Sequence, residues 1–133
     1  MRCLVVEDDF GSRRFLQLFL RRYFQCDVVV DGQEAVDAVR LAWEERDPYG
    51  LIFLDIMMPN LDGHGALKEI RSFEESIGVQ ESDAVKVIVL TALGDPRNVV
   101  EAYFRGAADG YLVKPAEPDQ IVKTLKEVGV EVE

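Results

Sequence analysis

The chain has 133 residues, which matches one domain with a single hydrophobic core. Its 25 acidic and 15 basic residues give a net charge of -10, which disfavours nucleic acid or an anionic membrane surface as a partner and favours proteins or cations. The sequence contains no apolar run long enough to span a membrane and no signal-peptide pattern, so we expect a soluble, cytoplasmic protein.

Strand and helix patterns alternate from the first residues onward. A short apolar run at 2–6 predicts a strand, and the three acidic residues that follow end it. Apolar residues at helical spacing then predict a helix at 10–24. A second strand is predicted at 26–30. The next helix begins after the turn at 31–32 and ends before the Asp-Pro pair at 47–48.

The middle of the chain predicts one more strand and one more helix. Residues 51–55, LIFLD, are apolar up to a final aspartate, which is typical of a strand that is covered on both faces. A helix with Leu67, Ile70 and Phe73 on one face comes next. The acidic stretch 74–84 then predicts a long loop, to which we assign no role.

The last third repeats the alternation. A fourth strand is predicted at 85–90, and the Gly-Asp-Pro sequence at 94–96 starts a helix that Gly106 ends. A short fifth strand at 110–113 leads to a turn and to a final helix. Its apolar face is formed by Ile121, Val122, Leu125 and Val128.

Five strands that alternate with five helices predict a parallel sheet with helices on both faces, which is a three-layer α/β domain. In such sheets the carboxyl ends of the strands meet at one edge, and ligands bind at this edge. The residues that follow the strands are therefore expected to lie together: Glu7, Asp8, Asp9, Asp31, Asp55, Thr91 and Lys114.

These residue types suit phosphoryl transfer. Carboxylates of Asp8 and Asp55, with Glu7 nearby, would repel one another unless a cation compensates, and Mg²⁺ prefers such a partial set of carboxylates completed by water and phosphate. Lys114 supplies positive charge, and the Thr91 hydroxyl can donate a hydrogen bond to a phosphoryl oxygen. The combination predicts transfer of a phosphoryl group to Asp55.

The motifs VVEDDF, LDIMMPNLDG, LTA and GYLVKP cover nearly the whole chain, and together they resemble the receiver domain of two-component response regulators. The compact chain is similar to the stand-alone chemotaxis-regulator type. This resemblance implies a flavodoxin-like fold with strand order 2-1-3-4-5. It also implies a single receiver domain, residues 1–133, without an output domain, which acts as a regulatory phosphoacceptor and not as an enzyme.

The resemblance also assigns the metal and phosphoryl sites. Asp55 is implied as the phosphoacceptor and a ligand of Mg²⁺, for which Mn²⁺ is an alternative. Asp8 would bind the ion directly, Glu7 mainly through water, and Met57 through its backbone carbonyl. Lys114 would pair with the phosphoryl group.

The resemblance further implies a conformational switch and two kinds of partner. Thr91 and Tyr111 match the switch residues of the family, and the Lys114-Pro115 bond matches its cis peptide. The donor would be a histidine kinase or a histidine phosphotransfer protein. A downstream protein would bind the face formed by the fourth helix, the fifth strand and the fifth helix. This face could present Tyr103, Phe104 and Tyr111, and the alternative for the two aromatics of the fourth helix is a place in the core. We expect a monomer or a dimer that phosphorylation induces.

Other interpretations of these residues stay open at this stage. Thr91 alone would suit a strand-end cap and Tyr111 a half-buried strand aromatic, and a receiver-like fold can also serve as an interaction module that signals without phosphate. A Mg²⁺-dependent phosphatase of the haloacid dehalogenase type also uses a strand-end aspartate. It needs an acid two residues later, where this chain has Met57. A flavin or nucleotide site needs a Gly-, Ser- and Thr-rich phosphate loop after the first strand. This chain has three acidic residues there, which would repel a phosphate.

Five residues that can react or bind metals are not expected to form a site. Met58 and the side chain of Met57 are expected to pack, and His64 is expected to lie exposed in a loop between glycines. Cys3 and Cys26 are expected to be buried thiols. A disulfide between the two is the alternative if their strands pair.

Two apolar residues predict slow loss of the phosphoryl group. Met57 and Leu93 stand two residues after the acceptor and the switch threonine, where many relatives carry a polar side chain that can orient the attacking water. We expect the purified phosphorylated form to decay slowly, followed by intact mass over time. A decay as fast as that of relatives with polar residues at both positions would contradict this expectation.

Overall fold

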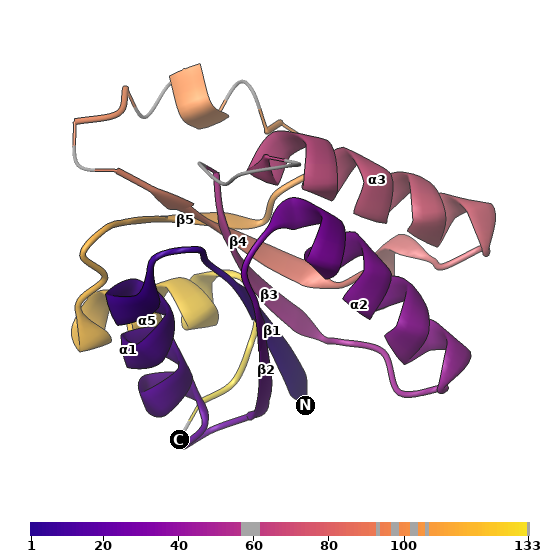
Figure 1. The fold of residues 1–133 in the computed structure, drawn as a ribbon, viewed down its shortest axis with the longest axis horizontal. Coiled ribbons are helices and arrows are strands. Elements are labelled where there is room, and N and C mark those ends of the chain that lie inside the picture. Colours follow the sequence, from indigo (N-terminus) through magenta and orange to yellow (C-terminus); the bar gives the residue numbers. More distant parts are fainter. Residues whose placement is uncertain (57–61, 93, 97–98, 102–103, 106, 133) are drawn as a thin grey trace.

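The computed structural model describes residues 1–56, 62–92, 94–96, 99–101, 104–105 and 107–132. In this part of the chain five parallel strands form one sheet in the order β2-β1-β3-β4-β5, which confirms the expected topology (Figure 1). The strands are β1 (Arg2–Val6), β2 (Gln25–Val29), β3 (Leu51–Asp55), β4 (Lys86–Thr91) and β5 (Gly110–Val113).

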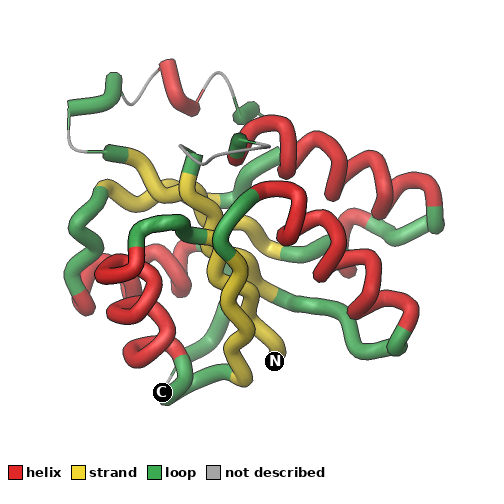
Figure 2. The backbone as a smooth tube through the Cα atoms, in the orientation of Figure 1, coloured by secondary structure: helices red, strands yellow, loops and turns green. Residues whose placement is uncertain are grey.

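Helices cover both faces of the sheet and complete the three-layer α/β fold (Figures 1 and 2). The described helices are α1 (Phe10–Leu20), α2 (Gly32–Glu44), α3 (Gly63–Ser76) and α5 (Pro118–Glu127), with a short 3₁₀ helix, η1 (Glu81–Asp83). Of the predicted fourth helix, residues 99–101 are helical, and its expected end at Gly106 lies outside the described residues. Among the helices that the structure describes, none is long and apolar enough to cross a bilayer.

Two apolar clusters explain why the central strands are apolar throughout. Because successive side chains of a strand point to opposite faces, β3 sends Ile52 and Leu54 to the layer of α2 and α3. It sends Leu51 and Phe53 to the layer of α1 and α5. All four side chains are fully buried. Each face of the sheet therefore has its own core, and no face is left for polar alternation.

Aspartates start three of the helices. Carboxylate oxygens of Asp9, Asp31 and Asp62 each accept a hydrogen bond of 2.8 Å from the backbone N–H three residues later. This is the N-cap interaction, which satisfies one of the unpaired donors of a helix start. Asp9 and Asp31, which the sequence groups with the strand-end acids, therefore cap helices at this edge of the sheet.

Two predicted boundaries differ from the structure by three residues or more, whereas the second and fourth strands are each shifted by one residue. The first helix ends at Leu20 instead of Phe24, and the expected acidic loop at 74–84 is wrong in its first three residues, because α3 continues to Ser76. The reason is Glu74, which is a buried acid of the helix and not a solvated loop residue. Its carboxylate accepts hydrogen bonds from the Arg71 guanidinium at 2.7 Å and from the backbone N–H of Val85 at 2.9 Å.

This buried carboxylate yields a stability prediction with a neighbour as its control. The substitution Glu74→Ala leaves the Val85 N–H and one face of Arg71 without an acceptor, so we expect the free energy of unfolding to fall by about 2–4 kcal/mol. Glu75→Ala removes an exposed carboxylate and should change the free energy of unfolding by less than about 0.5 kcal/mol. Urea denaturation measures both. Equal effects of the two substitutions would show that the Glu74 contacts contribute nothing.

Candidate functional site

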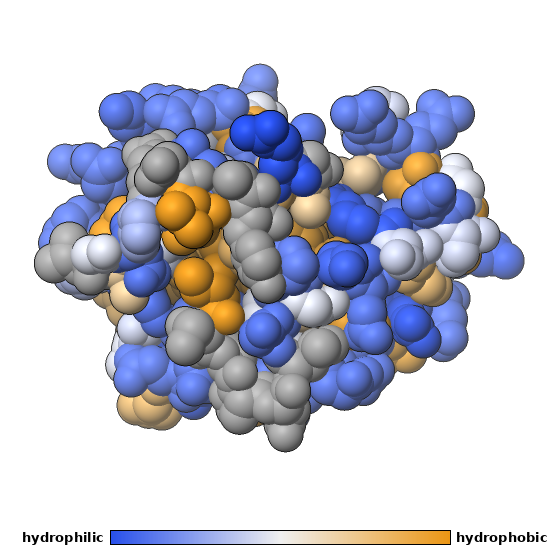
Figure 3. Space-filling model, turned by 90° about the horizontal axis from the view of Figure 1, so that it is seen from above, coloured by the Kyte–Doolittle hydropathy of each residue, from blue (hydrophilic) through white to orange (hydrophobic). Residues whose placement is uncertain are grey.

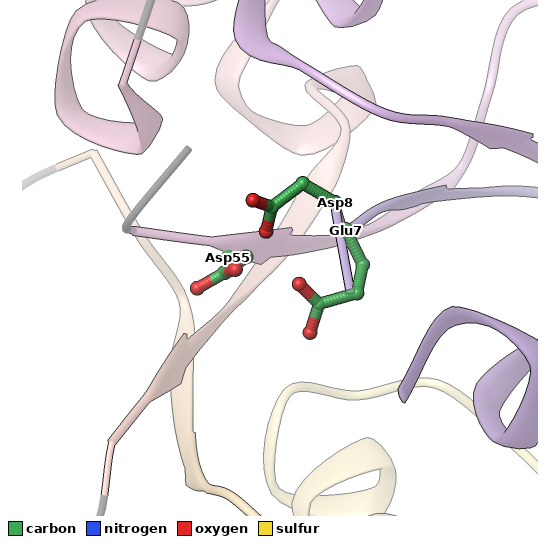
Figure 4. A group of neighbouring side chains, drawn as sticks. All are labelled: Glu7, Asp8 and Asp55. Carbon is green, nitrogen blue, oxygen red and sulfur yellow. The ribbon is translucent and has the colours of Figure 1, made fainter. Parts of the chain in front are cut away.

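Three carboxylates gather where β1 and β3 end (Figure 4). The two strands are parallel neighbours with Val6 opposite Leu54, so the residues that follow reach the same edge of the sheet. One oxygen each of Glu7, Asp8 and Asp55 can be chosen so that all three lie within 4.8 Å of one another. The Glu7 side chain is fully buried and Asp55 nearly so, whereas Asp8 is exposed. The structure therefore brings together the acids that the sequence proposed for a metal.

The ammonium group of Lys114 lies between two of these acids. Its Nζ is 2.7 Å from Oε1 of Glu7 and 3.3 Å from Oδ2 of Asp55. The backbone N–H of Lys114 donates to the carbonyl of Thr91 at 2.7 Å, which continues the pairing of β5 with β4 up to the site. The Lys114-Pro115 bond is cis, as the resemblance implied.

The electrostatics of the cluster show an incomplete balance of charge. Burial, together with a hydrogen bond to Asp55 and the charge of Asp55, raises the pKa of Glu7 to about 7, although the contact with Lys114 acts to lower it. Burial also acts to lower the pKa of Lys114. The hydrogen bond to Glu7 and the charge of Asp55 outweigh this effect, so that the pKa is raised. Without a further cation Glu7 therefore exchanges its proton near neutral pH, well above its usual range.

The donor set fits a hard divalent cation. Carboxylate oxygens are the ligands that Mg²⁺ prefers, and it usually combines one or two of them with waters. The exposed side chain of Asp8 leaves one side of the cluster open to solvent. The proposed fourth ligand, the carbonyl of Met57, lies outside the described residues, as do Met58 and Leu93.

The two proposed switch residues line one small cavity. Thr91 is buried at the end of β4, and its hydroxyl donates a long hydrogen bond of 3.4 Å to the carbonyl of Leu112. Tyr111 is half-buried on β5, and burial raises the pKa of its hydroxyl, with smaller effects of the charges of Glu101 and Asp109. Both residues border a cavity of about 30 Å³. The structure therefore places the two residues beside the same space.

Gly63 is a site residue that the sequence did not single out for this role. A Cβ atom at this position would lie 2.5 Å from the carbonyl oxygen of Asp55 and 2.8 Å from the Cα of Ile56. Helix α3 therefore starts in direct contact with the end of β3, which only glycine permits. A glycine directly after a helix-capping aspartate was the available signal.

His64 does not lie exposed in a loop, as the sequence suggested. It is half-buried in the first turn of α3, and its ring meets the ring of Phe104 edge to face at a centroid distance of 5.4 Å. Phe104 is itself buried in the core, so it is not offered to a partner, and Tyr103 lies outside the described residues. The flanking glycines suggested a loop, but the three-residue spacing to Leu67 already matched the buried face of the helix.

Comparisons with known proteins agree with this geometry. The model of the response regulator receiver domain family matches residues 3–126. The transcriptional regulatory protein ResD of Bacillus subtilis is 35% identical over 126 residues, which are 94% of this chain and 46% of ResD. The chain thus spans less than half the length of this curated relative.

Two solved structures share the fold over almost the whole chain. The receiver domain of the histidine kinase CKI1 from Arabidopsis thaliana, complexed with Mg²⁺ and BeF₃⁻, superposes with a TM-score of 0.78 at 28% identity. The match covers 96% of this chain and 88% of that one. The Saccharomyces cerevisiae co-crystal structure of the phosphotransfer protein Ypd1 and the Ssk1 receiver domain gives a TM-score of 0.75 at 30% identity, covering 95% and 87% of the two chains.

The raised pKa of Glu7 predicts a pH dependence of stability in the metal-free protein. Folded Glu7 keeps its proton up to about pH 7, whereas in the unfolded chain it releases the proton near its ordinary value of 4.5. Because of this group, the free energy of unfolding falls as the pH rises from the lower to the higher of these two values. From about pH 5 to about pH 8, the unfolding free energy of the wild type should fall by on the order of 2 kcal/mol relative to Glu7→Gln.

Urea denaturation in the presence of a chelator measures this difference at each pH. A difference between wild type and Glu7→Gln that stays constant over the same range would show that Glu7 titrates normally.

Proposed function

The chain belongs to the response regulator receiver domain family, and we propose that Asp55 accepts a phosphoryl group in a Mg²⁺-dependent step of a two-component phosphorelay. Receivers of this family are regulatory phosphoacceptors. The observation that carries the proposal is the position of Asp55, a carboxylate that is only 3% exposed, contacts the Lys114 ammonium and lies beside two further acids. The cytoplasmic location and the state of association stay predictions.

Each residue of the site has a part in the proposed transfer. A carboxylate oxygen of Asp55 attacks the phosphorus of a phosphohistidine, the P–N bond breaks, and the imidazole leaves. Lys114 is close enough to Asp55 to pair with an oxygen of the incoming group. A Mg²⁺ ion held by Glu7, Asp8 and Asp55 would neutralise charge on the phosphoryl oxygens. The receiver domain of CKI1 was crystallised with this ion.

The phosphodonor protein is proposed to bind beside α1. A pocket of about 340 Å³ lies between the start of this helix and the segment that follows β5. Phe15, Leu16 and Pro115 line it with apolar surface, and Lys114 lines its inner end. Because Lys114 also contacts Asp55, a protein seated here would be within reach of the acceptor. Arg13 and Arg14, which stand between the pocket residues Ser12 and Phe15 in the sequence, add positive charge to the start of α1 on an otherwise acidic protein.

The output of the switch is proposed to be read on the β5 side of the molecule. A phosphoryl group on Asp55 would attract the Thr91 hydroxyl, and the Tyr111 ring could then enter the space that the hydroxyl leaves. Tyr111 also lines a shallow groove with Gln120 and Lys123 of α5. Seen from above, the face of the molecule in Figure 3 is mostly hydrophilic, with several small apolar areas. A protein partner that contacts Tyr111 on this side would bind the phosphorylated and the unphosphorylated state with different affinities.

One mass measurement tests the phosphoacceptor. With Mg²⁺ and acetyl phosphate, the wild type should gain the mass of one phosphoryl group, and Asp55→Asn should gain none. Asp31→Asn is the matched control, because it alters another acid at this edge of the sheet while asparagine can still cap α2. A chelator should abolish the adduct.

Absence of an adduct on the wild type, or an equal adduct on Asp55→Asn, would falsify the proposal. Either result would favour the interaction module that works without phosphate.

A second test concerns the donor surface. Phe15→Ser removes an apolar side chain that is 41% exposed, and we expect it to slow phosphotransfer from a histidine phosphotransfer protein by about tenfold or more. The rate with acetyl phosphate should not change, since the small donor does not need this surface. Leu41→Ser, at an exposed position of α2, is the control.

The donor is chosen as the fastest of a panel of phosphorylated phosphotransfer proteins. If Phe15→Ser and Leu41→Ser behave alike with that donor, the proposed docking surface is wrong.

A further inference from the structure

The two cysteines of the chain are direct neighbours across two strands. Cys3 of β1 and Cys26 of β2 are partners in the parallel register. The two strands lie side by side in the sheet (Figure 1). Adjacent strands lie about 4.8 Å apart, which is within the Cα separation that a disulfide bridges, about 4.4–6.8 Å. Both side chains belong to the apolar cluster on the α1 and α5 face, so they point to the same side of the sheet.

The two thiols differ in access and in reactivity. Cys3 is fully buried, whereas Cys26 is half-buried on β2, which is an edge strand of the sheet. Both are free thiols. A hydrogen bond between them lowers the pKa of Cys26, and the same bond, with burial second, raises that of Cys3. Cys26 is therefore the thiol that an oxidant reaches first and the one that forms a thiolate more easily.

We propose that Cys3 and Cys26 form a redox-active pair, which hydrogen peroxide oxidises to an intramolecular disulfide. In the first step the Cys26 thiolate attacks one peroxide oxygen, the O–O bond breaks, and hydroxide leaves as water after taking up a proton. In the second step the Cys3 sulfur attacks the resulting sulfenic acid, the S–O bond breaks, and the Cys3 proton leaves with hydroxide as a second water. Two electrons pass from the two sulfurs to the peroxide.

The pair lies away from the phosphoryl site. Cys3 is near the start of β1 and Asp8 follows its other end, a separation of roughly 16 Å along an extended chain. The disulfide would tie β2 to β1 and enclose α1 in a covalent loop. The oxidation itself uses neither Asp55 nor a metal ion, so the test below does not rest on the proposed function.

The experiment exposes the reduced, folded protein to a molar excess of hydrogen peroxide, then denatures it and alkylates the remaining thiols with iodoacetamide. The wild type should lose both alkylatable thiols together and become about 2 Da lighter, and a peptide map should contain the linked Cys3 and Cys26 peptides. Dithiothreitol should restore both thiols. The variant Asp55→Asn should react in the same way.

Two variants assign the order of the steps. In Cys3→Ser, oxidation should stop at a sulfenic acid on Cys26 that dimedone traps, and in Cys26→Ser the buried Cys3 should stay alkylatable. The wild-type measurement needs no variant, so a failure of Cys3→Ser to fold leaves it intact. Cys3 that stays alkylatable in the oxidised wild type, or a disulfide that joins two molecules instead, overturns the proposal.

Discussion

The Lys114 ammonium group holds the strand-end cluster together. Its nitrogen contacts the carboxylates of Glu7 and Asp55, which are both almost inaccessible to water. Like charges in such a place repel one another and lack hydration, so they are tolerated because a positive charge lies between them. The pKa of Glu7 stays raised in spite of this contact, which means that one lysine does not balance the acids. The proposed Mg²⁺ ion would supply the positive charge that is still lacking.

The strand order makes this contact possible. Glu7 follows β1, Asp55 ends β3 and Lys114 follows β5. In the sheet β1 and β3 are neighbours, and only β4 separates β3 from β5. Because all five strands are parallel, their carboxyl ends share one edge, and a long lysine side chain can span the distance. Gly63 adds a second constraint at this edge, since its missing side chain lets α3 start against the end of β3.

A polar network fixes the opposite ends of β4 and β5. Arg71 of α3 donates to the carbonyl of Ala107 at 2.8 and 2.9 Å and pairs with Glu74 and with Asp109. Asp109 in turn accepts the backbone N–H of Val87 at 2.8 Å. The helix, the start of β4 and the approach to β5 are thus joined by hydrogen bonds. These contacts hold the two strands whose far ends carry Thr91 and Lys114.

The sequence by itself determined the alternation of strands and helices, the buried character of β3, and the set of acids at the strand ends. Apolar periodicity and motif spacing carry this information, since they report burial along a single element. The tertiary structure alone decided that Glu74 is buried in α3, that His64 packs against Phe104, that Lys114 sits closest to Glu7, and that Cys3 lies beside Cys26. The physical reason is that the partner of a polar or sulfur group depends on which elements pack side by side, and no local pattern records this.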